Sequence, residues 1–451
     1  MQKNIIAKKI IIGLGAVGKS FLRIIKENDM FHSEEFYCID YTDEAGEYFT
    51  CMGGRDSHYI SCKLERDNYE SALNIAEQGD YILDFAINVK NLDMLDYCMR
   101  SKIHYLSLAD ASWFPDPAWI NTFQHYKDYR NIRKNIKDNT FPTCIVEFGM
   151  NPGLVSCFMK QCIDKIIEKD ESSYISKHRE GLKKLLEENK YNEVAMKIGL
   201  KYVVEIDNDN QQFNVTEEEK TVYSPWCPFA YHMETLAVPE IYFGTKREFY
   251  LHDYLSDCDQ KDYFVALTKT GITCREDIYS PQGKVNGFLS THEEIFSMGD
   301  YLRVNKYKPT VYFVYSPCEL AEKTALACMN INEAEVNYQI LNQSDYLSGG
   351  ESIGVILQGK RFKTRYFGNY LGGEGLAETA TVLQVSASAY AAYKYMLEHP
   401  DNGLMFPEDL PHRDLLNTAR RYLKEYIDVE CPSISPQYGL EPKEKKGFKK
   451  A

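Results

Sequence analysis

Three glycines near the N-terminus have the spacing and the setting of a phosphate-binding turn. Gly13, Gly15 and Gly18 follow an apolar run at 8–14 and lead into a helical pattern at 17–26. In this context the first glycine allows a tight turn, the second lets the backbone approach a pyrophosphate, and the third lets helix and strand pack closely. Free N–H groups at the helix N-terminus attract phosphate. The residues expected to contact a dinucleotide here are Gly13, Gly15, Ala16, Val17 and Gly18.

An acidic residue ends the next apolar run. Asp40 closes the segment at 35–40, at about the twenty-residue distance where a carboxylate accepts hydrogen bonds from the adenosine ribose. A carboxylate repels a 2′-phosphate, and the following residues Tyr41, Thr42 and Asp43 offer no arginine to bind one. The sequence therefore predicts NAD as the cofactor in preference to NADP.

Apolar runs alternate with helical patterns over the first third of the chain. The predicted strands are 8–14, 35–40, 80–88, 103–107 and 143–148, and the predicted helices between them include 17–26 and 92–100. Strands that alternate with helices form a parallel sheet with right-handed crossovers. We therefore expect an α/β fold in which residues 1–150 form a Rossmann-type, doubly wound parallel sheet that binds NAD.

The rest of the chain has a different pattern. The segment at 149–156 breaks the alternation and starts a helix, and a helix rich in lysine and glutamate is expected at 176–191. Residues 201–315 alternate apolar and polar side chains, as half-buried antiparallel strands do. The sequence thus predicts a second, mixed α+β domain for substrate binding and dimerisation at 151–375. Residues 376–451 are expected to form helices that pack back on the first domain, followed by a mobile basic tail.

The composition narrows the class of protein. The 451 residues include 52 basic and 66 acidic side chains, a formal net charge of -14, which disfavours nucleic acid as a partner. No apolar run has the length needed to span a bilayer, so no membrane partner is expected. The thirteen cysteines include no Cys-x-x-Cys pair, which indicates neither a disulfide framework nor a zinc ribbon. We expect reduced thiols, a cytoplasmic location and no metal.

Motifs of the second half resemble those of the saccharopine dehydrogenase-like reductases and, within that group, the bacterial homospermidine synthases. They are NPGLVS at 151–156, Ser224-Pro-Trp226 followed by Glu234, LSTHEE at 289–294, ESIGVIL at 351–357 and LQVS at 383–386. The resemblance covers nearly the whole chain. It implies that NAD accepts a hydride from an amine-bearing carbon of putrescine and that a second putrescine attacks the imine with loss of ammonia. The same NADH then reduces the new Schiff base to homospermidine, with no net redox change.

Trp226 and Glu234 are the first candidates for the substrate site. A diamine is a dication near neutral pH, so its site needs carboxylates and benefits from an aromatic face that contacts a cation or iminium. From residue type alone, Trp226 fits a half-buried core position as well, and a glutamate without context is usually solvated. The resemblance places the tryptophan at the substrate and matches Glu234 with a carboxylate that holds the amine.

Asn151 and His292 are the other two catalytic candidates. The amide of Asn151 would orient the nicotinamide or the substrate nitrogen, although an Asn-Pro pair also forms an ordinary turn. His292 precedes Glu293 and Glu294 and would relay protons or bind an amine, with a structural histidine as the alternative. The resemblance also matches Glu351 and Asp207 with acids of the substrate site.

Two positions depart from the family's pattern. The family has a glutamate just before the tryptophan that follows the fourth strand of the nucleotide domain, and Ala111 occupies that place here. Asp110 would substitute for this glutamate only from the neighbouring position in the chain, where a side chain normally points away from the site. Asn88 stands where an aspartate is expected near the cofactor. Such changes would alter the choice of amine or lower the activity.

Two other functions remain open at this point. An oxidoreductase of the same fold, such as saccharopine or carboxyspermidine dehydrogenase, binds amino-acid carboxylates and should present arginines, which the motifs above lack. A non-catalytic NAD-sensing protein would bind the cofactor without turnover. The expected partners are a small diamine, putrescine or also spermidine, and a second copy of the chain in a homodimer.

Overall fold

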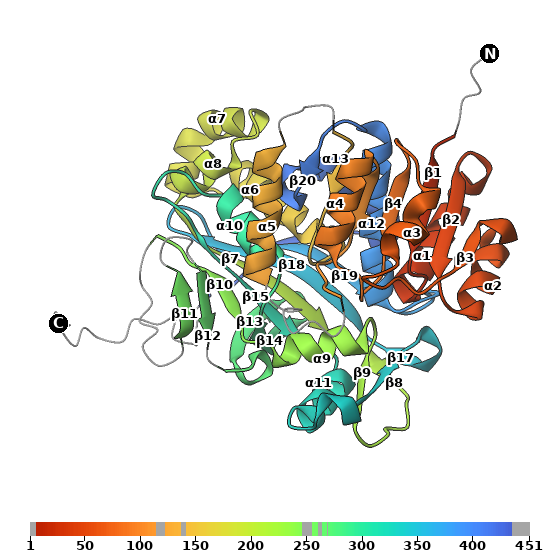
Figure 1. The fold of residues 1–451 in the computed structure, drawn as a ribbon. Coiled ribbons are helices and arrows are strands. Elements are labelled where there is room, and N and C mark those ends of the chain that lie inside the picture. The colour runs from red at the N-terminus through yellow and green to blue at the C-terminus, as the bar shows by residue number, and fades with distance from the viewer. Residues whose placement is uncertain are drawn as a thin grey trace, which may run out of the picture.

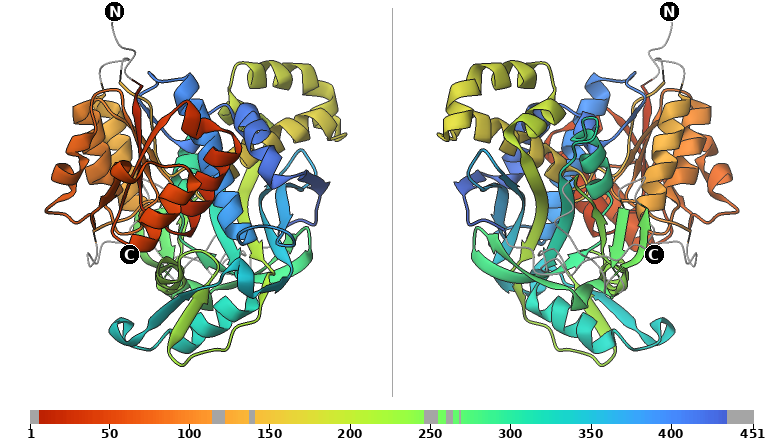
Figure 2. Two further views of the ribbon diagram at one scale, coloured as in Figure 1. Left: turned by 90° about the vertical axis from the view of Figure 1, so that its right-hand side faces the viewer. Right: turned by 90° about the vertical axis from the view of Figure 1, so that its left-hand side faces the viewer.

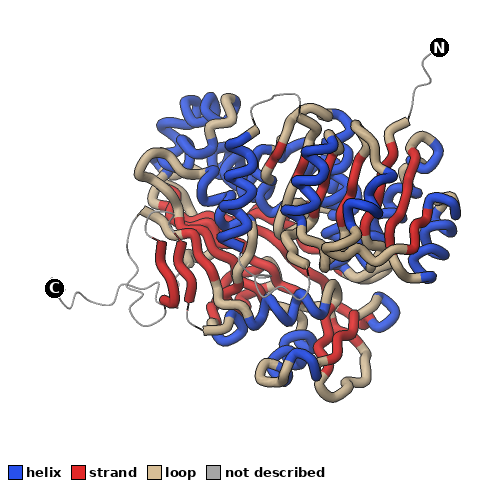
Figure 3. Tube along the Cα trace, viewed as in Figure 1, coloured by secondary structure: helices blue, strands red, loops and turns tan. Residues whose placement is uncertain are grey.

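The computed structural model describes residues 6–113, 122–136, 141–245, 255–259, 264–267 and 269–434. The described residues end at 434, so the basic C-terminal tail, for which mobility is expected, lies outside them except for its first residues. Within the described part of the chain, no helix combines the length and the apolar character needed to cross a membrane. Figure 1 shows two sheets with helices around them, and Figure 3 distinguishes the strands from the helices along the same view.

The first sheet has seven strands, all parallel, and confirms the predicted Rossmann-type fold. Its strands, in spatial order, are β20 (Leu404–Met405), β6 (Cys144–Ile145), β5 (His104–Ser107), β4 (Tyr81–Asp84), β1 (Lys8–Ile12), β2 (Glu35–Asp40) and β3 (Tyr59–Ser61). The order 3-2-1-4-5-6 is that of a doubly wound dinucleotide fold, in which the ligand crevice opens beyond the carboxyl ends of the strands where the order reverses. Here that point lies between β1 and β4.

Helices connect these strands and cover the sheet. They are α1 (Ala16–Glu27), α2 (Asp43–Met52), α3 (Tyr69–Ala72), α4 (Asn91–Ser101) and α5 (Thr122–Asn135). The amphipathic helix α1 buries Phe21, Leu22, Ile24 and Ile25 completely, because its apolar positions recur at helical spacing on the face toward the sheet. The predicted strand at 35–40 coincides with β2, and the predicted helix at 92–100 lies within α4.

The second sheet has ten strands and mixed directions. They are β7 (Leu200–Asp209), β10 (Glu240–Tyr242), β11 (Leu255–Asp259), β12 (Phe264–Leu267), β13 (Arg275–Ser280), β14 (Gly283–Ser290), β15 (Thr310–Ser316), β18 (Gly350–Gly359), β19 (Arg365–Gly372) and β21 (Tyr426–Glu430). The main path runs β11-β12-β10-β15-β7-β18-β19-β21, and β14 pairs with both β13 and β15. Two short pairs lie outside it: β9 (Thr221–Ser224) with β16 (Asn337–Ile340), and β8 (Gln212–Phe213) with β17 (Tyr346–Ser348).

The expectation of half-buried antiparallel strands across residues 201–315 is wrong for the strands at the two ends of this range, β7 and β15. The central strand β7 pairs in parallel with β15 and is buried along almost its whole length. Val203 belongs to the main hydrophobic core and Val204 to a second core on the opposite face. A strand covered on both faces has no reason to alternate apolar and polar residues. The region also contains α9 (Pro228–Leu236) and α10 (Glu294–Tyr301).

Helix α6 (Leu154–Lys169) leads from the first sheet to the second and packs on β18 and β19. After it come α7 (Ser173–Glu187) and α8 (Tyr191–Ile198), with α11 (Glu319–Cys328) and α13 (His412–Leu423) later in the chain. The 3-10 turns are η1 (Met30–His32), η2 (Asp56–His58), η3 (Leu73–Ile75), η5 (Gly271–Thr273), η6 (Glu333–Glu335), η7 (Gln343–Asp345) and η8 (Pro407–Asp409).

The helix rich in alanine and serine is α12 (Ala380–Glu398), which lies alongside α1 (Figure 2). The hydroxyls of Ser20 and Ser386 are 2.6 Å apart, and the ring of Tyr393 packs against that of Phe21. Small side chains allow this close approach of two helices. The rest of the C-terminal segment does not pack on the first sheet alone, because α13 packs on α6 and β21 is a strand of the second sheet.

Candidate functional site

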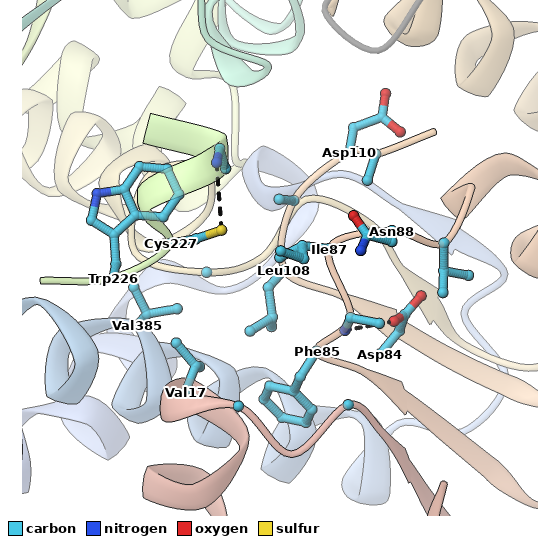
Figure 4. Close-up of a pocket in the computed structure, with 18 of the residues that line it drawn as sticks. Val17, Asp84, Phe85, Ile87, Asn88, Leu108, Asp110, Trp226, Cys227 and Val385 are labelled. Carbon is cyan, nitrogen blue, oxygen red and sulfur yellow. Dashed lines mark hydrogen bonds between the residues drawn. The ribbon is translucent and has the colours of Figure 1, made fainter. Parts of the chain in front are cut away.

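A cavity of about 540 Å³ lies where the carboxyl edge of the first sheet meets the second sheet. Its wall includes the turns that follow β1, β2, β4 and β5, the segment 149–152, and parts of β7, β15, α9 and α12. Figure 4 shows Trp226 and Cys227 on one side of it and Phe85, Ile87 and Asn88 on the other. Residues from distant parts of the sequence thus line one continuous space.

The glycine turn occupies one end of this cavity. Gly13 has a φ of 79°, a backbone conformation that L side chains rarely adopt. A Cβ atom on Gly18 would lie 2.5 Å from the carbonyl oxygen of Gly13, whereas one on Gly15 would meet nothing within 4 Å. The helix that follows has no side-chain cap, so the N–H groups of its first turn face the cavity free to bind phosphate. These residues fit a dinucleotide.

Asp40 lies at the end of β2 and lines the same end of the cavity. Its Oδ2 atom accepts the Leu14 N–H at 2.7 Å, which ties the glycine turn to the second strand. Its Oδ1 atom accepts the N–H groups of Tyr41 and Thr42 at 2.7 and 3.0 Å. The carboxylate is therefore held rigidly at the position where a ribose hydroxyl would reach it. Lys63 lines the cavity close by, on the segment after β3.

The turn after β4 forms the middle of the cavity wall. Asn88 lines it, as expected for a residue near the cofactor. Asp84, at the end of β4, accepts hydrogen bonds from the Tyr105 hydroxyl at 2.8 Å and the Asn91 amide at 3.2 Å. Burial nevertheless raises the pKa of Asp84 to about 7. This carboxyl group fixes the turn, and the sequence motifs did not single it out.

Trp226 and Glu234 lie at the far end of the cavity. Trp226 is half-buried just before α9, and its indole N–H donates to the Tyr315 hydroxyl at 3.4 Å. Glu234, on α9, accepts the Ser290 hydroxyl at 3.0 Å. Exclusion of water raises the pKa of Glu234 to about 7, although His292 and the Ser290 hydroxyl favour its charged form. A carboxyl group with this pKa is suited to accept and return a proton near neutrality.

Asn151 and Asp207 meet across the two sheets. The Asn151 amide donates to Asp207 Oδ2 at 3.3 Å, and both residues line the cavity. Burial and the nearby Asp209 raise the pKa of Asp207 to about 8. Glu351 does not line the cavity: it lies on β18, fully buried, behind Asp207. Burial, and then the charge of Asp207, raise the pKa of Glu351 well above its ordinary value, so Glu351 acts on the cavity through its charge interaction with Asp207.

His292 is surrounded by carboxylates. Its Nδ1 atom forms a short contact with Glu294 Oε2 and lies 3.5 Å from Glu293 Oε2. Although burial opposes a charged ring, the carboxylates of Glu294, Glu293 and Glu234 raise the pKa of His292 to about 10. The ring is therefore an imidazolium at neutral pH, which partly balances the buried negative charge. His292 and Glu293 line the cavity.

Asp110 also lines the cavity, but its carboxylate is already engaged. It forms a short ion pair with the His125 ring and accepts the Tyr129 hydroxyl at 3.0 Å. Although burial disfavours the imidazolium, this carboxylate raises the pKa of His125 above its ordinary value. Ala111 contributes only a methyl group to the same wall. Asp110 thus lies within the site, but its paired carboxylate does not replace the glutamate that the family has at the position of Ala111.

Sequence reasoning missed a group of buried glutamates behind the cavity. Its members are Glu147, Glu205, Glu294 and Glu408; Glu294 lay within the motif at 289–294 but was given no role of its own. One signal was present for Glu205: it alternates with Asp207 and Asp209 in β7, which places three acids on one face of the strand. Glu408 gave no such signal, because it comes from a distant turn.

Glu205, His292 and Glu294 are also the described residues that could hold a metal ion. One ligand atom from each lies within 4.8 Å of the others. Nδ1 of His292 already contacts Glu294, however, so an ion bound through this nitrogen would have to displace the proton that makes the ring a cation. The expectation that the protein uses no metal remains a prediction.

The buried carboxyl groups predict an unusual dependence of stability on pH. Burial raises the pKa of six such groups to about 7 or 8: Asp84, Asp207, Asp209, Glu234, Glu276 and Glu408. The folded state then holds protons that the unfolded chain releases above its ordinary carboxyl pKa of about 4. The free energy of unfolding should therefore fall as the pH rises from about 5 to about 8.

Urea denaturation of the ligand-free protein at pH 5.5 and 7.5 would measure this slope. Glu276→Gln removes one of the six groups and should reduce the slope of unfolding free energy against pH by that group's contribution. Glu65→Gln, at an exposed position, should leave the slope unchanged. A stability that is constant or increases over this range would contradict the prediction.

Comparison with known proteins agrees with this geometry. Residues 10–140 match the family model for the saccharopine dehydrogenase NADP binding domain. The chain is 24% identical to a homospermidine synthase of Blastochloris viridis, over 96% of this chain and 94% of that protein. It is 21% identical to a homospermidine synthase of Mesorhizobium japonicum, over 95% and 89% of the two chains.

Solved structures share the fold. A homospermidine synthase from Legionella pneumophila in complex with NAD superposes with a TM-score of 0.78 at 22% identity, covering 96% of this chain and 93% of that one. A saccharopine dehydrogenase from Saccharomyces cerevisiae gives a TM-score of 0.53 at 9% identity, covering 94% and 100%. The chain thus combines a saccharopine dehydrogenase-type nicotinamide dinucleotide-binding domain with similarity over nearly its whole length to homospermidine synthases.

Proposed function

We propose that this protein is a homospermidine synthase that joins two putrescines to give homospermidine and ammonia, with NAD regenerated in each cycle. The residues assigned to catalysis are Trp226, Glu234, His292 and Asn151, and those assigned to binding the diamine are Asp207 and, through Asp207, Glu351. Asp110, also expected to bind the diamine, lines the site but is paired with His125. Residues 1–150 would bind NAD, 151–375 would hold the substrate, and 376–451 would close the structure around both.

The observation that carries this proposal is the make-up of the cavity. One continuous space joins the dinucleotide turn to a wall that contains Trp226, Glu234, Asp207 and Glu293. Among the described residues that line it, no arginine is found, and the single lysine, Lys63, lies at the Asp40 end. A substrate that carries a carboxylate would meet only the rings of His125 and His292 there, and these are already paired with Asp110 and Glu294. A diamine, in contrast, meets carboxyl groups there.

The chemistry follows from these positions. The glycine turn and Asp40 would hold NAD, which when bound would supply reversible hydride transfer at the amine-bearing carbon. The chain's own residues manage charge and protons. Glu234 accepts the proton of the reacting ammonium, because its pKa of about 7 allows exchange near neutrality. Trp226 offers its ring face to the cationic imine, and Asn151 and Asp207 orient the nitrogen.

Three finer points belong to the same proposal. Spermidine would serve as a second donor, since it carries the same aminobutyl group. The protein would be a homodimer built through its second domain, whose outermost strand β11 leaves one sheet edge unpaired among the described residues. A cytoplasmic location is supported by the cysteines, because those whose side chains are described are all free.

The central test is turnover per NAD. With putrescine and substoichiometric NAD⁺, the purified protein should release homospermidine and ammonia over many turnovers without accumulation of NADH, because the hydride is returned within each cycle. Chromatography of the amines and absorbance of NADH would measure this. Stoichiometric NADH formation would indicate a dehydrogenase, and binding of NAD without chemistry would indicate a sensor; either result would overturn the proposal.

Trp226→Ala should lower kcat about 100-fold and leave the dissociation constant of NAD within about twofold, because the ring contacts the substrate end of the cavity only. Trp226→Phe, which keeps an aromatic face, should retain part of the activity. Steady-state kinetics and calorimetric NAD titration would give the two quantities. Equal losses of turnover and of NAD binding would contradict the assigned role.

Asp40→Ala should weaken NAD binding about tenfold and raise the affinity for NADP, because the change removes the ribose partner and the charge that repels a 2′-phosphate. Lys63, on the same wall, would then be available to the phosphate. The double variant Asp40→Ala/Lys63→Ala is the matched control and should lose the gain for NADP. An unchanged preference between the two cofactors would argue against Asp40 as the discriminating residue.

A further inference from the structure

Two buried glutamates behind the cavity have no hydrogen-bond donor. Glu147 and Glu205 are fully buried, and neither oxygen of either carboxyl group has a partner in the structure. Glu147 follows β6 with a φ of 56°, a strained conformation for a residue other than glycine, and its side chain turns inward. Isolated buried carboxylates are costly, so such groups hold a proton or share one with a neighbour.

The charged neighbours of Glu147 and Glu205 lie both at the main cavity and behind it. The charges that act on Glu147 come from Asp110 and Glu293, which line the main cavity, and from Glu294 and Glu408 behind it. One ligand atom from each of Glu205, Glu294 and His292 lies within 4.8 Å of the others, and Glu205 is also close enough to Glu408 for their charges to interact. The carboxyl groups of Glu147, Glu205, Glu294 and Glu408 are thus neighbours in the interior, and this series lies behind the substrate end of the cavity.

The series ends at a second cavity. This cavity, of about 460 Å³, lies between α5, α10 and η8, and Glu408 and Ser297 contribute to its wall. Glu408 Oε1 accepts the hydroxyls of Ser156 at 2.7 Å and Ser297 at 3.1 Å. Arg133 and Lys134 lie on the same wall, and both are exposed to solvent. Glu408 therefore stands between the buried glutamates and a space that solvent can enter.

We propose that Glu294, Glu205, Glu147 and Glu408 form a proton relay that connects His292 and Glu293 in the substrate cavity with the second cavity. The relay deepens the proposed function and rests on it, because it serves the ammonium groups of the diamines. Its geometric basis is a group of buried carboxyl groups, of which Glu147 and Glu205 have no hydrogen-bond donor, with one cavity at each end.

Proton balance in the proposed reaction shows why a relay is useful. Each reacting ammonium must lose one proton before its nitrogen can form or attack an imine, so two protons leave the two substrates. Both return at the end of the cycle, one to the departing ammonia and one to the secondary amine of the product. The two dications become one trication and one ammonium ion, so no net proton is consumed. Two protons must still be held while bound substrates fill the cavity.

Other features of Glu408 suit it to the solvent end of the relay. Burial raises the pKa of Glu408 to about 7, so it can take up and release protons near neutrality. The neighbouring Lys160 donates to the backbone oxygens of Glu408 and Leu410 at 3.0 and 2.8 Å, so its ammonium is directed at carbonyl groups. The carboxyl group itself has only the two serine hydroxyls as side-chain donors among the described residues.

Glu408→Gln tests the relay in the full-length protein with NAD and putrescine. We expect kcat to fall about tenfold while KM for putrescine stays within about twofold, because the residue touches no substrate. The ratio of kcat in H₂O to kcat in D₂O should rise, since proton transfer becomes limiting, and Glu408→Asp should recover most of the loss. Glu276→Gln is the matched control, because Glu276 is equally buried with a raised pKa but lies outside the series.

Infrared difference spectra provide a readout that does not depend on turnover. Addition of putrescine to the NAD complex should change the carbonyl stretch of protonated carboxylic acids, and Glu147→Gln should remove part of that change. A Glu408→Gln variant with wild-type kcat and isotope ratio, or a Glu147→Gln spectrum identical to that of the wild type, would overturn the relay. Absence of homospermidine formation by the wild type would instead overturn the proposed function. The infrared difference spectra of wild type and Glu147→Gln would still test the relay in that case.

Discussion

Burial of carboxyl groups without matching basic side chains is the constraint on which the site depends. Glu147, Glu205 and Glu351 are fully out of water, and their carboxyl oxygens have no hydrogen-bond donor in the structure. Such groups are stable only when they are protonated, share a proton or face a cation. The imidazolium of His292 supplies part of this balance. An ammonium group of a bound diamine would supply more, which links the stability of the site to its occupation.

The fold brings these acids together by joining two sheets at their edges. The first sheet contributes Asp110 and Glu147 from the carboxyl ends of its strands, and the second contributes Glu205 and Asp207 from β7. The carboxyl edge of a doubly wound sheet is already the place where a dinucleotide binds. A second sheet packed against that edge converts an open crevice into a largely enclosed cavity, where charge interactions are stronger than in water.

The dinucleotide end of the site was predictable because its determinants are local. The turn at Gly13, the close approach at Gly18 and the start of α1 lie within a few residues of one another. Asp40 is connected to them by a single hydrogen bond to Leu14. The substrate end was predictable only in part, through Trp226, Glu234 and His292, which came from motif resemblance and which the structure brings to one cavity.

By itself, the sequence determined the Rossmann-type order of elements, the glycine turn and the excess of acidic residues, because periodicity, backbone freedom and composition are properties of short segments. It did not determine that β7 is buried on both faces, that Asp110 is occupied by His125, or that Glu351 stands behind Asp207. Those facts depend on contacts between residues far apart in the chain. Only the packing of the two sheets and of η8 decided which carboxyl groups are buried behind the cavity and which line it.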